Sequence, residues 1–248
     1  IISYIMENMM NNFVNKLKAK IKSNRYVELK KQRGMSLLEV IIVLGIIGTM
    51  AAVVVVLAQR AFSNKDITDL NDNTNSVRVA AVAAYESAGA YPSAAATAIG
   101  LTPATIKTSN TATAPMVATL VNLGQISLNE IKNGISGDYF TMKGIKLDAA
   151  ATGEPKGFVM VVNGLDQTEC RSLLLQAGNQ WDFVSVDSAA GGADPTTWPA
   201  SLSEKVVANS AKGVLRSLVA GGQVAITATS VAANCEDTSD NAIFLGSK

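Results

Sequence analysis

The sequence contains no histidine and only two cysteines among its 248 residues. Without histidine, the ordinary Ser/His and Cys/His nucleophile pairs and the commonest ligand of zinc are absent. No glycine-rich segment follows a predicted strand and opens a helix, as a phosphate-binding loop requires. Carboxylates such as Asp138, Asp148 and Glu154 lie in polar, turn-like stretches, where a solvated surface is the expectation. The sequence therefore favours a protein that is not an enzyme and has no cofactor or metal.

Basic side chains are scarce after the first part of the chain. Residues 1–34 carry eight Lys or Arg and two Glu, whereas residues 35–248 carry thirteen basic and eighteen acidic side chains. If the basic segment is removed, the product is acidic, which is a poor match for a polyphosphate backbone. Nucleic acid is therefore not an expected partner.

One dense apolar run extends from residue 35 to residue 58, and Glu39 is its single ionisable group. As a helix, a run of this length extends about 36 Å at 1.5 Å per residue, and the hydrocarbon core of a bilayer is about 30 Å thick. A secretory signal peptide has a shorter apolar region followed by a small-residue cleavage site. We expect this segment to span a membrane, with the basic residues before it on the cytoplasmic side.

The helical pattern continues beyond the apolar run. Apolar residues recur at spacings of three to five between positions 62 and 88, and charged side chains lie off that stripe. Gly89 is a suitable C-terminal cap, and the Tyr91-Pro92 pair disfavours continuation. We predict one helix over about 36–88, whose second half packs one side against a globular head.

The remainder of the chain predicts a head of short helices and antiparallel strands. We expect helices at 114–123, 127–132, 166–177 and 204–219, and strands at 139–147, 156–162, 181–186, 223–229 and 242–245. Two capping-box pairs, Ser127 with Glu130 and Asp166 with Glu169, support the second and third helices. The predicted class is α+β, a long N-terminal helix with a mixed head.

The two cysteines, Cys170 and Cys235, have no CxxC spacing and no histidine to complete a soft metal site. A disulfide is the better interpretation, and it presumes an oxidising compartment. Closing a loop of this length would stabilise the fold by about 4 kcal/mol on the chain-entropy model. The alternative is two unpaired, buried cysteines.

The junction between the basic segment and the apolar run is the most specific motif. The stretch Arg33–Val40, RGMSLLEV, resembles the processing site of type IV prepilins. The resemblance implies that a prepilin peptidase cuts between Gly34 and Met35 and methylates the new N-terminus of Met35. Glu39 then becomes the fifth residue and pairs with the terminal amine of a neighbouring subunit during assembly. A carboxylate inside a membrane helix costs about 2.5–3.5 kcal/mol, so a cationic partner is also expected on physical grounds.

The long leader, the Met at the cleavage site and several later patches resemble type IVb pilins. Among these, the toxin-coregulated pilin and the longus and colonization-factor pilins of enteric bacteria are the most similar, with patches at 57–61, 133–138, 163–165, 169–172 and 214–218. The resemblance implies a type IV pilin fold, with a helical spine packed on a central antiparallel sheet. The implied organisation is a cleaved leader (1–34), an N-terminal helix (35–88) with a membrane and fibre-core part (35–58), and a head (89–248) with a disulfide-bounded region (170–235).

This resemblance implies a structural major subunit that polymerises into an extracellular fibre for adhesion, bundling and colonisation. Its implied partners are copies of itself, the prepilin peptidase, the inner-membrane assembly machinery and a host cell surface. The precursor would lie in the inner membrane of a Gram-negative bacterium, and the fibre would be extracellular. A minor pilin or a type II secretion pseudopilin is the main alternative. A DNA-uptake pilin is a third, which the acidic balance of residues 35–248 disfavours.

Overall fold

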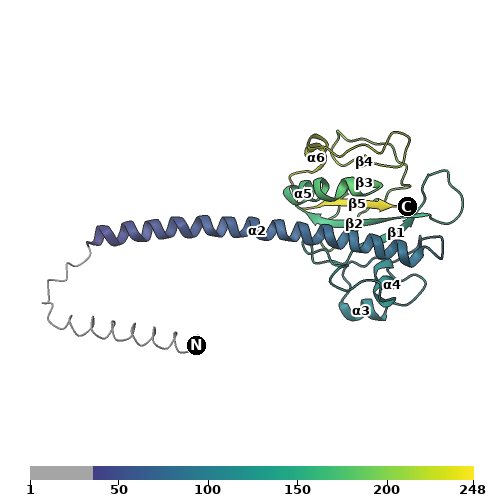
Figure 1. The fold of residues 1–248 in the computed structure, drawn as a ribbon, viewed down its shortest axis with the longest axis horizontal. Coiled ribbons are helices and arrows are strands. Elements are labelled where there is room, and N and C mark those ends of the chain that lie inside the picture. Colours follow the sequence, from purple (N-terminus) through teal and green to yellow (C-terminus); the bar gives the residue numbers. More distant parts are fainter. Residues whose placement is uncertain (1–35) are drawn as a thin grey trace, which may run out of the picture. The chain divides into compact units, whose positions relative to one another are not determined.

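The computed structural model describes residues 36–248. The elements are α2 (Leu37–Tyr85), α3 (Pro103–Thr108), α4 (Met116–Asn122), β1 (Thr141–Ile145), β2 (Gly157–Leu165), α5 (Gln167–Ala177), the 3-10 helix η1 (Gly178–Gln180), β3 (Phe183–Ser188), β4 (Val214–Arg216), α6 (Ala228–Asn234) and β5 (Asn241–Ser247) (Figure 1). The chain divides after Val56 into two compact units, and residues 57–248 form the larger one, which we call the head.

The helix α2 is a single α-helix whose ends have clear local causes. At its start, the Ser36 carbonyl accepts hydrogen bonds from the backbone N–H groups of Glu39 and Val40, at 2.9 and 3.2 Å. Beyond its end, Gly89 adopts φ +62° and donates its N–H to the Tyr85 carbonyl at 2.9 Å. This left-handed conformation suits glycine, which has no Cβ to clash. The predicted long helix and its glycine cap are confirmed, and the helix ends three residues earlier than predicted.

A five-stranded sheet forms the centre of the head, in the order β1-β2-β5-β3-β4. Every neighbouring pair is antiparallel, and the C-terminal strand β5 lies in the middle between β2 and β3. The free edge of β1 is partly closed, because the Gly144 N–H donates to the Pro92 carbonyl at 2.7 Å. A Cβ at Gly144 would lie 2.5 Å from the Tyr91 carbonyl oxygen, so only glycine allows this approach.

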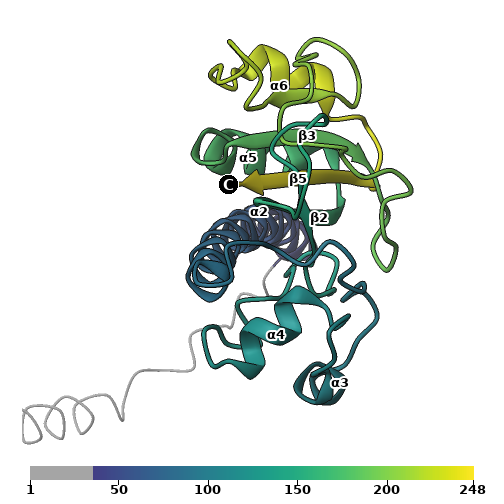
Figure 2. The same ribbon diagram turned by 90° about the vertical axis from the view of Figure 1, so that its right-hand side faces the viewer.

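The two faces of the sheet bury different sets of side chains. The larger core contains Leu70 and Val77 of α2, Leu120 of α4, Leu174 of α5 and Phe158 of β2. Figure 2 shows the sheet on one side of α2 and the helices α3 and α4 on the other. The smaller core, on the opposite face of the sheet, is covered by the loop that carries Trp198 and Leu202. The head thus has a helical side and a side covered only by loops.

The predicted α+β class, the α4 and α5 helices and the four strands corresponding to β1, β2, β3 and β5 are confirmed. The helix predicted at 127–132 is wrong, since this segment forms turns and ends in an isolated antiparallel bridge between Lys132 and Tyr139. Its capping pair is nevertheless present, because the Ser127 N–H and hydroxyl both donate to Glu130 Oε2, at 3.0 and 2.7 Å. Only one of the two hydrogen bonds of a capping box is therefore present, the one from the Ser127 N–H to Glu130, and no helix follows.

The segment 204–234 was predicted least well. The helix predicted at 204–219 is wrong, because Lys212 adopts a left-handed φ of 55° and a Cβ at Gly213 would lie 2.5 Å from the Val207 carbonyl oxygen. The chain continues as the edge strand β4 instead. The strand predicted at 223–229 is also wrong, because Thr227 caps α6 through its hydroxyl and the Ser230 N–H, at 3.3 Å.

Candidate assembly site

The processing site predicted at Gly34 and Met35 lies outside the described residues. The cut between these residues and the methylation of Met35 therefore stay predictions. Ser36 is the first described residue, and α2 begins directly after it.

Glu39 lies in the first turn of α2 and is exposed. The partial positive charge at a helix N-terminus favours a carboxylate in this turn. The sequence offers no other ionisable side chain between Glu39 and Arg60, so the charge of Glu39 is isolated on an otherwise uncharged segment. No hydrogen bond or ion pair to the Glu39 side chain occurs within the described part of the chain. The carboxylate is thus available to a partner outside this chain.

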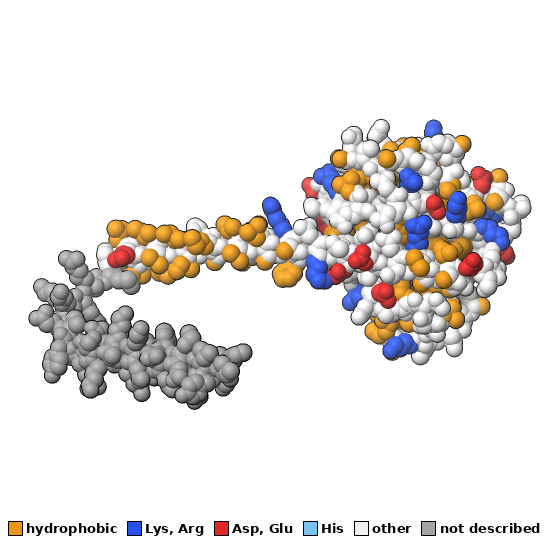
Figure 3. Space-filling view, viewed as in Figure 1, with side chains coloured by type: hydrophobic (Ala, Val, Ile, Leu, Met, Phe, Trp, Pro, Cys, Tyr) orange, Lys and Arg blue, Asp and Glu red, His pale blue; other side chains and the backbone are white. Residues whose placement is uncertain are grey.

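The surface around Glu39 is apolar on all sides. Leu37 is 80% exposed and Leu44 is 62% exposed, and none of the most apolar window of α2 is buried. Figure 3 shows hydrophobic side chains all along this part of α2 on the face in view. Burying one such side chain is worth about 1.5–3 kcal/mol. This segment therefore requires a cover of lipid or of other apolar helices.

The spacing of Ser36 and Glu39 also corresponds to a capping box, in which a Glu or Gln at the third helical position bonds back to the cap residue. The Ser-x-x-Glu signal is visible in the motif, but the capping hydrogen bond from Ser36 N–H to the Glu39 carboxylate does not form among the described residues. The carboxylate of Glu39 is therefore not used by a local cap. Gln keeps the size and hydrogen-bonding groups of this side chain but cannot pair with an ammonium group as an anion.

The second part of α2, from Leu57 onward, belongs to the head and has a different surface. Its inward stripe is fully buried and consists of Ile67, Leu70, Thr74, Val77, Ala80 and Ala81. The outward side carries charges, including Lys65, which pairs with Asp69 one turn later. The periodicity in the sequence predicted this amphipathic pattern, which is typical of a helix on the surface of a globular core.

Arg78 connects α2 to the C-terminal end of β5 and to η1. Its Nε donates to the Ser247 hydroxyl at 3.2 Å, and its Nη1 donates to the Gln180 carbonyl. The guanidinium also lies 5.2 Å from the centroid of the buried Trp181 ring. Sequence reasoning placed Arg78 off the apolar stripe and assigned it no role. Its partners are 102 and 169 positions away, so no local pattern could have indicated them.

The disulfide joins Cys170 of α5 to Cys235, which directly follows α6, with an S–S distance of 2.03 Å and a Cα–Cα distance of 6.0 Å. Both cysteines are buried. The Gln167 amide adds a hydrogen bond to the Cys235 carbonyl, and an Arg171 Nη donates to the Ala232 carbonyl. The disulfide therefore holds together the two helices that bound the region 170–235.

Comparisons with known proteins agree with this arrangement. The family model described as the toxin-coregulated pilus subunit TcpA matches residues 119–244, and the prokaryotic N-terminal methylation motif matches residues 29–55. The toxin coregulated pilin of Vibrio cholerae serotype O1 is 35% identical over 193 residues, which cover 77% of this chain and 77% of that protein. The chain belongs to the toxin-coregulated pilin family.

A second toxin coregulated pilin of Vibrio cholerae is 37% identical to this pilin over 162 residues, which cover 65% of this chain and 64% of that protein. The crystal structure of TcpA, a type IV pilin from the El Tor biotype of Vibrio cholerae, superposes with a TM-score of 0.57 and 26% identity. The alignment covers 74% of this chain and 99% of the crystallised chain. The type IV pilin fold is confirmed. The chain is a pilus subunit of a structural family and not an enzyme.

Proposed function

We propose that this pilin is the major subunit of an extracellular type IVb fibre that serves adhesion, bundling and colonisation. The observation that carries the proposal is the uncovered first part of α2, which is apolar on all sides and has the isolated carboxylate of Glu39 in its first turn. Such a surface suits two successive environments, the membrane before assembly and a bundle of identical helices afterwards.

The proposed maturation follows from the methylation motif at 29–55. The leader 1–34 is removed by a prepilin peptidase, and Met35 becomes the methylated first residue. The N-terminal segment 35–88 carries α2, its part 35–58 lies in the membrane or the fibre core, and residues 89–248 complete the globular part. The region 170–235, bounded by the disulfide, lies at the surface and mediates contacts between subunits and between fibres.

In the proposed assembly step, the Glu39 carboxylate pairs with the terminal amine of Met35 in a neighbouring subunit. A buried carboxylate without a partner is costly, so the correctly registered neighbour is favoured over any other position along the helix. The partners are the inner-membrane assembly machinery, further copies of the chain and a host cell surface. The similarity to toxin coregulated pilins supports this role over that of a pseudopilin or a DNA-uptake pilin.

The test uses three variants in cells that carry the assembly machinery, with fibres counted by electron microscopy and sheared pilin measured by immunoblot. Glu39→Ala removes the whole polar side chain, Glu39→Gln keeps its size and hydrogen-bonding groups without the charge, and Glu154→Ala is the matched control at an exposed position. We expect Glu39→Ala and Glu39→Gln to lower the fibre yield at least tenfold, while the cell-bound amount stays normal.

Normal fibre yield from Glu39→Ala would contradict the proposed pairing. A normal yield from Glu39→Gln together with a low yield from Glu39→Ala would show that the charge of Glu39 is not needed, which also contradicts the proposed pairing. The control Glu154→Ala should assemble like the unmodified chain.

A further inference from the structure

The loop-covered face of the sheet contains a hollow of about 210 Å³. Its floor is made by neighbouring strands, because Ser185 of β3 lies opposite Phe244 of β5 and opposite Val214 of β4. Two residues further along β3, Asp187 also lines the hollow and lies opposite Ala242. The hollow therefore lies over the part of the sheet where β3, β4 and β5 meet.

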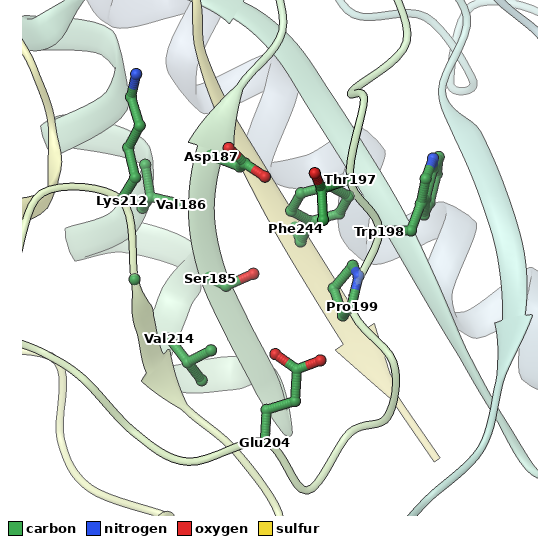
Figure 4. A pocket seen from close by; sticks show the side chains of 11 residues that line it. Ser185, Val186, Asp187, Thr197, Trp198, Pro199, Glu204, Lys212, Val214 and Phe244 are labelled. Atoms are coloured by element: carbon green, nitrogen blue, oxygen red, sulfur yellow. The ribbon is translucent and has the colours of Figure 1, made fainter. Parts of the chain in front are cut away.

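The floor of the hollow is apolar and its rim is polar. Phe244, Val214 and Pro199 supply apolar surface, and Trp198 packs edge to face against Phe244 at a centroid distance of 5.3 Å. Figure 4 shows the carboxylates of Asp187 and Glu204 at opposite ends, with the hydroxyls of Ser185 and Thr197 between them.

Ser185 provides a hydroxyl group on the rim of the hollow. Its side chain is only 7% exposed, and its hydroxyl makes no hydrogen bond to another described residue. Figure 4 shows this hydroxyl directed into the hollow, toward Pro199 and Phe244. This hydroxyl is not among the buried side-chain atoms that lack a partner, so it is accessible from the hollow. Ser185 thus offers a donor and an acceptor to whatever occupies the hollow.

The carboxylates keep unused acceptor oxygens. Oδ1 of Asp187 accepts the Ser188 N–H at 2.8 Å, and Oε1 of Glu204 accepts the Ala200 N–H at 2.5 Å. The second oxygen of each carboxylate makes no hydrogen bond to another described residue. Each end of the hollow therefore offers a free acceptor for a hydroxyl donor of a ligand.

The charged side chains around the hollow exclude some classes of ligand. The carboxylates of Asp187 and Glu204 disfavour an anionic ligand. Lys212 forms an ion pair with Glu236 at 2.8 Å, and this hydrogen bond raises the pKa of Lys212. The positive charge of Lys212 near Asp187 disfavours a cationic ligand at that end of the hollow. No group of three acidic, His or Cys side chains that could hold a metal ion occurs among the described residues.

We infer that this hollow binds one residue of a neutral sugar. The polar groups are spread around the rim instead of converging on one point, as hydroxyl groups are spread around a pyranose ring, and the apolar floor suits the C–H face of that ring. The volume is below the range of about 300–1,000 Å³ typical of larger ligands, which also favours a single ring. The biological use of this site rests on the proposed fibre, because weak single sites gain strength when many copies bind together.

The first test measures binding to the mature chain as a monomer in detergent, so that it does not depend on fibre formation. Saturation-transfer NMR is recorded with galactose, glucose, mannose and N-acetylglucosamine, and with sialic acid and glucosamine as charged probes. We expect a signal from at least one neutral sugar. We expect Ser185→Val, which fills the hollow, and Asp187→Asn to weaken that binding at least fivefold. Asp148→Asn, in an exposed turn, is the matched control and should not change it.

Three results would overturn the inference: no signal from any neutral sugar, equal signals from the unmodified chain and the two hollow variants, or stronger binding of sialic acid or glucosamine than of every neutral sugar. Glu204→Gln provides an independent variant on a different segment if Ser185→Val does not fold. Fibres carrying Ser185→Val should form in normal yield but bind sugar-coated beads at least tenfold less than unmodified fibres. Absence of fibres from both chains would contradict the proposed function while the NMR result still decides the sugar site.

Discussion

The two parts of α2 form one continuous helix but differ in how their apolar side chains are exposed to solvent. Before Leu57 the helix has large apolar side chains on every side, and all of them are exposed. After Leu57 the helix buries one stripe in the head and keeps charged residues outside. Helical hydrogen bonding is the same in both parts, so the difference lies in the side chains alone. The second part is stable because of its own chain, whereas the first part requires other molecules.

The largest effect is expected from breaking the disulfide of the head, the unit to which the second part of α2 belongs. Replacing both Cys170 and Cys235 with Ser removes the bond between α5 and the end of α6. On the chain-entropy model this lowers the free energy of unfolding by about 4 kcal/mol. Urea unfolding of the detergent-solubilised chain, followed by tryptophan fluorescence, measures the loss. Unfolding at the same urea concentration as the unmodified chain would contradict the structural role of the bond.

A pair of identical substitutions compares the two parts of the helix directly. Leu70→Ala removes a side chain that is 1% exposed in the main core, and it should cost about 3 kcal/mol of unfolding free energy. Leu44→Ala removes a side chain that is 62% exposed in the first part, and it should leave the unfolding of the head unchanged. Similar costs for both variants would show that the two parts are not energetically separate.

Arg78 offers a smaller test of how the head holds the second part of α2. Arg78→Leu removes hydrogen bonds to Ser247 and Gln180 and the contact with the Trp181 ring, so we expect a cost of about 2 kcal/mol. Arg78→Lys keeps the charge but not the planar donor geometry, and it should restore only part of the loss. Arg60→Leu, at an exposed position of the same helix, is the control and should cost almost nothing. Full rescue by Lys would mean that charge alone matters.

The smallest effect concerns the turn at Ser127, which replaces a predicted helix. Hydrogen bonds from the Ser127 hydroxyl and backbone lower the pKa of Glu130 below its ordinary value of 4.5. A lowered pKa in the folded state stabilises the fold above pH 4.5, and this contribution is lost as the pH falls through the lower, folded-state pKa. Because Glu130 is close to solvent, Glu130→Ala should cost only about 0.5 kcal/mol at pH 7. The difference between the two chains should vanish in acid, and a difference that persists there would exclude the carboxylate as its cause.

The sequence predicted most of the fold where the signals are local. The apolar run, the stripe of the second part of α2, the Gly89 cap and the Asp166 capping box each depend on residues within a few positions of one another, and all four predicted helical features are present. The segment 204–234 was predicted wrongly because its conformation depends on the close approach of Gly213 to Val207 and on the edge of the sheet. Apolar spacing alone could not distinguish those contacts from an amphipathic helix.

Among the functional residues, too, those in a local motif could be predicted from the sequence and those brought together by the fold could not. Gly34, Met35 and Glu39 form a motif within six positions, so the sequence alone is enough to make them candidates. The hollow at Ser185 could not be predicted, because Ser185, Phe244 and Val214 come together only through the register of three strands. The role of Arg78 could not be predicted either, because its hydrogen-bond partners Ser247 and Gln180 are distant in the sequence.

The most direct test of the account is the intact mass and N-terminal sequence of the chain sheared from the cell surface, measured without reductant. We predict long filaments whose subunit begins at N-methylated Met35 and is lighter by two hydrogens because Cys170 and Cys235 are joined. A chain that stays bound to the cell and keeps residues 1–34 would contradict the processing at Gly34 and Met35 and, with it, the assembly through Glu39.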